Sequence, residues 1–84
     1  MVSHRNVGKV SVYPNPAFAN LRVSFPQANI SRTMQIIAAD GRIVQVKTLI
    51  ANSVQQHLEV TTLPKGNYFI KIERNTQTVS FTKQ

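Results

Sequence analysis

The sequence predicts an all-β fold, because apolar and polar side chains alternate through most of its 84 residues and no stretch shows a sustained helical period. The alternating runs are short, and residues typical of turns separate them. These turn signals are a double-proline segment at 13–16, Asp-Gly at 40–41, Pro-Lys-Gly at 64–66 and Asn75. Seven short antiparallel strands at this spacing predict an immunoglobulin-like β-sandwich.

The first two strands are expected at residues 10–13 and 21–25, on either side of the corner Tyr13-Pro14-Asn15-Pro16. In the second strand Leu, Val and Phe alternate with Arg and Ser, as in a half-buried strand. The corner cannot be helical, since each proline lacks an amide donor and holds the residue before it in extended geometry. We expect it to end the first strand and to aim the chain across to the second.

Residues 33–38 and 42–49 are expected to form the third and fourth strands, paired as a hairpin. Asp40 and Gly41 lie between them. Asp-Gly is typical of a type I′ turn, in which both central residues have positive φ. The sequence therefore predicts a tight type I′ hairpin here.

The fifth strand is expected at residues 54–60. One face of this strand is expected to hold Val54, Gln56, Leu58 and Val60. The segment Leu63-Pro64-Lys65-Gly66 follows it and suits a type I turn.

The sixth strand begins near Tyr68, which follows Gly66 by two residues. A leucine, a turn glycine and a tyrosine at this spacing are typical of a tyrosine corner, in which the phenol hydroxyl bonds back to nearby backbone. We therefore expect Tyr68 to have a structural role.

The last strand is expected at residues 76–83. Val79 and Phe81 would anchor it in the core, while hydroxyl side chains make its other face polar and Lys83 places a cation at its end. A terminal strand is well placed to pair with a receptor or to present itself to one.

The composition excludes several kinds of site. The chain has no cysteine, which excludes disulfides, thiolate metal sites and thiol nucleophiles. No apolar run approaches the roughly 20 residues that span a bilayer, so no membrane-spanning segment is expected. The first residues lack the apolar stretch of a signal peptide, so an export signal is expected elsewhere in a longer precursor.

Catalysis is not expected from this sequence. The three acidic residues, Asp40, Glu59 and Glu73, are scattered, and no spacing forces two of them together. His57 alternates with the apolar residues of its strand, so we expect it to face solvent rather than to act as a base or ligand. No nucleophile elbow and no phosphate-binding glycine loop is present. We therefore expect no enzyme activity, no metal site and no cofactor.

The charge balance indicates a partner with an anionic surface. Ten Lys and Arg stand against three Asp and Glu, which gives a net charge of +7. The basic residues are dispersed, and aromatic residues accompany them only at Tyr68-Phe69, so a nucleic-acid partner is not expected. An adhesive or carbohydrate-binding β-sandwich module stays open as an alternative, although such a module usually exposes several aromatic residues.

Three segments, VYPNPAFANLRVSF, DGRIV and LPKGNYFIKIERNTQTVSFTKQ, together carry a family resemblance. In this order, over residues 10–84, they resemble the type A C-terminal sorting domain of proteins exported by the type IX secretion system of Gram-negative bacteria. The Tyr-Pro-Asn-Pro start, the Gly-Arg hairpin, the Leu-x-x-Gly-x-Tyr turn and the basic last strand are specific as a set. The sequence departs from the family at Ala38, where members often have an acidic residue three positions before the hairpin glycine.

The resemblance implies a folded address at the end of a larger cargo protein. Residues 1–9 would then be a linker that contains or follows the cleavage region, and residues 10–84 the sorting domain. The implied partners are the type IX translocon, the covalently linked N-terminal cargo, and a sortase-like cysteine peptidase that removes the domain and joins the cargo to lipopolysaccharide. The implied route leads through the periplasm to the cell surface or the medium.

The resemblance also implies which residues form the recognition and structural motifs. They are Tyr13, Pro14, Asn15, Pro16, Asp40, Gly41, Leu63, Gly66, Tyr68, Val79, Phe81 and Lys83. Among these segments, the last strand is expected to be the part on which export depends most.

Overall fold

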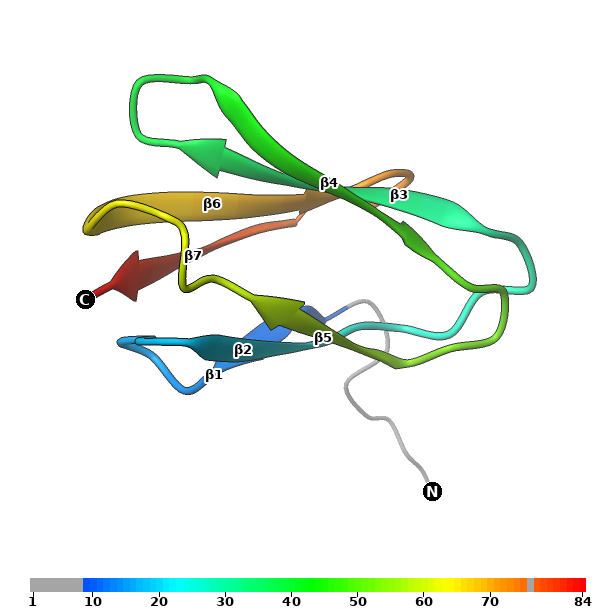
Figure 1. The fold of residues 1–84 in the computed structure, drawn as a ribbon. Coiled ribbons are helices and arrows are strands. Elements are labelled where there is room, and N and C mark those ends of the chain that lie inside the picture. The colour runs from blue at the N-terminus through cyan, green and yellow to red at the C-terminus, as the bar shows by residue number, and fades with distance from the viewer. Residues whose placement is uncertain (1–8, 76) are drawn as a thin grey trace.

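The computed structural model describes residues 9–75 and 77–84, which form seven strands (Figure 1). The strands are β1 (Ser11–Tyr13), β2 (Asn20–Ser24), β3 (Arg32–Ala38), β4 (Ile43–Leu49), β5 (Gln55–Glu59), β6 (Gly66–Ile72) and β7 (Thr78–Lys83). Within these residues no helix is long and apolar enough to cross a membrane.

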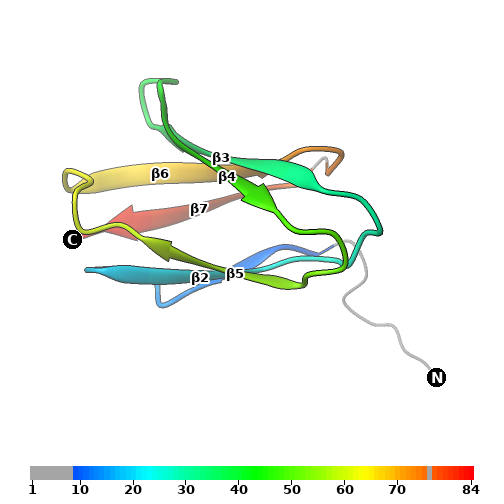
Figure 2. The same ribbon diagram turned by 45° about the vertical axis from the view of Figure 1, so that its right-hand side comes forward.

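The strands form two antiparallel sheets that face each other as two layers (Figures 1 and 2). One sheet has the order β1-β2-β5, and the other has the order β4-β3-β6-β7. The predicted seven-stranded immunoglobulin-like sandwich is thereby confirmed.

A single apolar core lies between the two sheets. In β2, Leu21 and Val23 are buried while Arg22 between them is exposed, because successive side chains of a strand point to opposite faces. The same alternation runs through β3, β6 and β7. The largest fully buried side chains are Phe81, Leu21, Met34, Ile36, Leu49, Leu58, Ile70, Ile72, Val23 and Val60.

The β3–β4 hairpin was predicted correctly, but its predicted turn type is wrong. The amide of Gly41 donates to the carbonyl of Ala38 at 2.9 Å, and the amide of Ala38 donates to the carbonyl of Arg42 at 2.8 Å. Gly41 has a φ of 91°, whereas Asp40 does not have positive φ. The turn therefore centres on residues 39 and 40, with glycine as the left-handed residue after it, a pattern found in three-residue hairpin loops.

Two smaller expectations about the fifth strand and the turn after it are wrong as well. β5 begins at Gln55, one residue later than expected, and Val54 before it is 52% exposed. The hydrogen-bonded turn after β5 lies at residues 60–63, where the amide of Leu63 donates to the carbonyl of Val60 at 3.0 Å. The chain therefore turns three residues earlier than expected.

Arg32 is an exception to the expected pattern of dispersed surface charge. It is 5% exposed, and its guanidinium lies over the ring of Phe25, 5.2 Å from the ring centroid. Its Nε and Nη2 atoms are buried without a hydrogen-bond partner. Since burying unpaired polar atoms costs free energy, the aromatic contact only partly offsets the burial of this side chain.

Candidate functional site

All of the motif residues except Val79, which lies within β7 opposite Ile70, gather at one end of the sandwich. In this antiparallel fold successive connections alternate between the two ends, so the β1–β2, β3–β4 and β5–β6 connections and the C-terminus share one end. Figures 1 and 2 show all four on the left. We call residues 13–17, 38–42, 63–68 and 81–84 the motif end.

The proline corner pairs with the end of β7. The side-chain Oδ1 of Asn15 accepts a hydrogen bond from the amide of Thr82 at 3.0 Å. The amide of Ala17 donates to the carbonyl of Thr82 at 2.8 Å, and the amide of Gln84 donates to the carbonyl of Ala17 at 2.8 Å. The corner thus crosses to the opposite sheet and forms a short parallel bridge there before the chain enters β2.

This pairing changes the expected role of both segments. The corner does end β1, but it does not lead directly to the next strand, because it first covers part of the outer edge of β7. The edge that was expected to be available to a receptor is therefore occupied at Thr82 and Gln84. Both X–Pro peptide bonds of the corner are cis.

Ala17 and Thr82 were not singled out by the sequence analysis. Ala17 is completely buried, and its size suits a position where two backbones approach closely. The one feature of the sequence that could have indicated this close approach is a small residue directly after the second proline. Thr82 gave no local signal, because its role depends on a partner 67 positions away.

Tyr68 forms the predicted tyrosine corner. Its hydroxyl donates to the carbonyl of Pro64 at 2.6 Å, four residues earlier in the chain. The ring is buried and stacks on Phe81, with ring centroids 5.5 Å apart and an interplanar angle of 20°. Tyr68 therefore joins the turn before β6 to the core at the motif end.

Replacement of Tyr68 by phenylalanine should lower the free energy of unfolding by about 1–2 kcal/mol, because the carbonyl of Pro64 loses its partner while the ring packing stays. Urea denaturation would measure this loss. Tyr13→Phe is the matched control, since the Tyr13 hydroxyl accepts only an exposed bond from Gln55. Equal stability of Tyr68→Phe and the unaltered protein would contradict a structural role for the hydroxyl.

Gly66 and Lys83 face each other across β6 and β7. Gly66 has a φ of 152°, a conformation that other residues adopt only with strain. Lys83 is only 8% exposed, and its Nζ donates to the carbonyl of Gln84 at 2.8 Å. Lys83 does stand at the end of β7, as expected, but its side chain is buried on the inward-facing side of the strand together with Val79 and Phe81.

A cleft of about 410 Å³ lies between the β3–β4 hairpin and the turn before β6. Its lining includes Ala38, Asp40, Arg42, Leu63, Lys65 and Tyr68. Asp40 and Arg42 form a salt bridge of 3.4 Å, but both side chains are well exposed, so this pair adds little stability. Arg42 and Lys65 make this part of the motif end basic.

The motif end is a basic surface whose connections are bonded to one another. Arg42 and Lys65 supply its exposed positive charge, while the proline corner and the end of β7 use backbone groups and the Asn15 side chain to bond to each other. Within residues 9–75 and 77–84, no three His, Cys, Asp or Glu side chains lie close enough to hold a metal ion. His57 is exposed, as expected, and its Nε2 contacts the Oδ1 of Asn20 at 2.9 Å.

Comparison with known families assigns the chain. Residues 11–84 match the family described as "Secretion system C-terminal sorting domain". A comparison with curated proteins finds no match. The matched range includes all seven strands and every part of the motif end. The chain therefore belongs to the family of C-terminal sorting domains of the type IX secretion system.

Proposed function

We propose that this domain is the secretion signal of a larger protein joined to its N-terminus. We further propose that the outer-membrane translocation machinery of the type IX system binds the motif end. The family assignment supports the role in secretion. The convergence of the proline corner, the hairpin turn, the tyrosine corner and the end of β7 supports the motif end as the surface that is bound.

The position of β1 supports this arrangement. Val10 is buried, and its amide donates to the side-chain Oε1 of Gln77 near the start of β7. This contact lies at the end of the sandwich opposite the motif end (Figure 1). A cargo joined before Val10 is therefore attached at the end of the sandwich away from the motif end.

Processing is proposed to take place upstream of Val10. The linker expected at residues 1–9 lies, except for Lys9, outside the described residues. The packing of Val10 into the core supports a domain boundary at this point. In this proposal a sortase-like peptidase cuts within or before the linker, and the cargo continues from the periplasm to the cell surface or the medium.

A matched pair of charge reversals tests the proposed surface. The protein is fused behind a periplasm-targeted reporter in a host with a working type IX system. Arg42→Glu with Lys65→Glu should lower surface delivery about tenfold or more, because the loss of roughly 1.4 kcal/mol of binding is already a tenfold change. The control, Lys47→Glu with Lys71→Glu, makes the same change of charge on exposed side chains outside the motif end.

Thermal melting would check that both pairs fold, since all four side chains are exposed. Delivery of the reporter by both variants at the level of the unaltered fusion would refute the motif end as the bound surface. An equal loss of surface delivery by both pairs would show that export depends on the net charge of the domain and not on the motif end.

A further inference from the structure

The outer face of the three-stranded sheet is polar throughout. Strand pairing places Ser11, Ser24 and Gln55 in one row across β1, β2 and β5. The next row holds Tyr13, Arg22 and His57. Rows on one face of a sheet lie roughly 7 Å apart, so the two rows are close neighbours.

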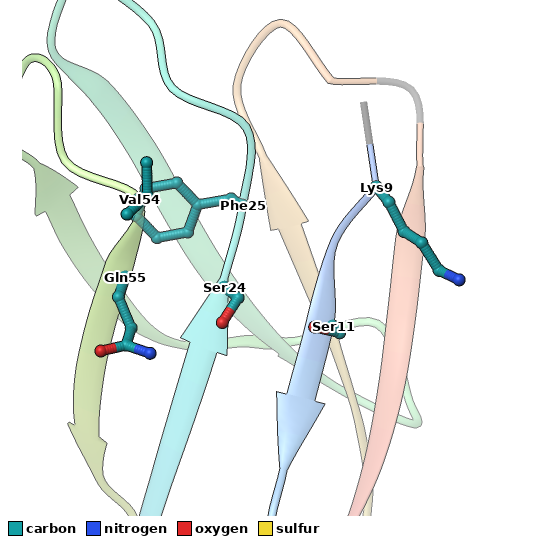
Figure 3. Close-up of a pocket in the computed structure, with 6 residues that line it drawn as sticks. All are labelled: Lys9, Ser11, Ser24, Phe25, Val54 and Gln55. Atoms are coloured by element: carbon teal, nitrogen blue, oxygen red, sulfur yellow. The ribbon is translucent and has the colours of Figure 1, made fainter. Parts of the chain in front are cut away.

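Two hollows open along these rows. The first, of about 400 Å³, is lined by Lys9, Ser11, Ser24, Phe25, Val54 and Gln55 (Figure 3). In Figure 3 the three polar side chains of the row project from neighbouring strands, while Lys9 extends away from the other lining residues. The second hollow, of about 150 Å³, is lined by Tyr13, Pro14, Asn20, Leu21, Arg22 and His57.

A hydrogen bond links the two hollows. The Nε2 of Gln55, in the first, donates to the hydroxyl oxygen of Tyr13, in the second, at 3.1 Å. This bond uses the Tyr13 oxygen as an acceptor and leaves its proton able to donate. The Tyr13 ring is 48% exposed beside Pro14, which gives the second hollow an accessible apolar wall.

Arg22 supplies a positive charge at the second hollow. It is exposed, and among the residues that the structure describes it takes part in no salt bridge. Glu59 lies in the next row, paired with Asn20, and no salt bridge joins it to Arg22. A guanidinium in this position can bind a carboxylate or a phosphate through two parallel hydrogen bonds.

We propose that this face binds an acidic oligosaccharide of at least two sugar units. Serine, asparagine and glutamine side chains can both donate to and accept from sugar hydroxyls, and the ring of Tyr13 can pack against the apolar face of a sugar. Arg22 would bind the acidic group. A single-stranded nucleic acid fits less well, because each base needs an aromatic side chain to stack on and this face exposes one, whereas the two polar rows can hold a sugar chain through its hydroxyls even with a single aromatic ring.

The site overlaps the proposed translocon contact only at Tyr13 and Pro14. The proposal does not depend on the secretion role, because it concerns binding by the 84-residue protein alone.

The test is a titration of the isotope-labelled protein, followed by amide chemical shifts in NMR spectra. The probes are hexagalacturonate, which carries carboxylates, and a pentamannose phosphate, with neutral maltohexaose and a six-nucleotide oligothymidine for comparison. We expect saturable shifts in β1, β2 and β5 with at least one acidic sugar and weaker shifts with maltohexaose. Arg22→Glu should weaken binding of the acidic sugar about tenfold or more.

Lys71→Glu is the matched control, since it makes the same change of charge on the other sheet. It should leave the affinity within about twofold, as expected for screened, distant charges. Tyr13→Ser should weaken binding of every sugar that binds. The proposal is overturned if neither acidic sugar binds, if Arg22→Glu and Lys71→Glu act equally, or if oligothymidine binds more tightly than the sugars.

Discussion

Phe81→Ala should lower the free energy of unfolding by about 3–5 kcal/mol, which is the usual loss for a fully buried phenylalanine. Phe81 is 1% exposed and stacks on Tyr68, so its removal leaves a cavity against the tyrosine corner. Small domains have only about 5–15 kcal/mol of stability in total, so this variant should be partly unfolded at moderate temperature. Urea denaturation followed by circular dichroism measures the loss.

Phe69→Ala is the control for this prediction. Phe69 lies on the outer face of β6 and is 38% exposed, so the same truncation should cost much less. A loss at Phe69 as large as that at Phe81 would contradict the placement of Phe81 in the core and of Phe69 on the outer face.

A chain that ends at Thr78 should leave most of a fused reporter in the periplasm. This truncation removes nearly all of β7, exposes the edge of β6 and deletes Phe81 from the core. Ser80→Asp is the comparison, because Ser80 points outward in the middle of β7 and its replacement should leave both the fold and export intact. Cell fractionation and surface labelling measure delivery.

Much of this loss of export is expected to come from unfolding of the domain rather than from lost recognition. Lys83→Ala alone cannot separate recognition from folding, because Lys83 is buried opposite Gly66. Circular dichroism of the truncated protein should therefore show a lost cooperative melt. Normal surface delivery by the protein that ends at Thr78 would contradict any need for β7.

The strands were predictable from sequence because burial of one face forces a period of two. Leu21 and Val23 illustrate this, since both alternate with exposed residues and both are in the core. The shared position of the motif residues at one end was also implicit in the sequence, because connections in an antiparallel fold alternate between ends.

Other features depend on contacts that no local pattern contains. The pairing of Ala17 with Thr82 and the stacking of Arg32 on Phe25 both join segments that the sequence keeps apart. The burial of Lys83 was not predicted, because lysine side chains are usually exposed. Its position in the alternation of β7 nevertheless turns the side chain inward. At Asp40 and Gly41 the dipeptide predicted a hairpin, but the hydrogen bonds of Ala38 set the turn type.

The bridge between the proline corner and β7 determines when, during synthesis, the motif end can form. Asn15 and Thr82 are 67 positions apart, so a ribosome completes one partner long before the other. A chain released early, or clipped before Thr82, has the corner but nothing for Asn15 and Ala17 to pair with. If the motif end is what the translocation machinery binds, the complete binding surface is present only on proteins that have been synthesised and folded through β7.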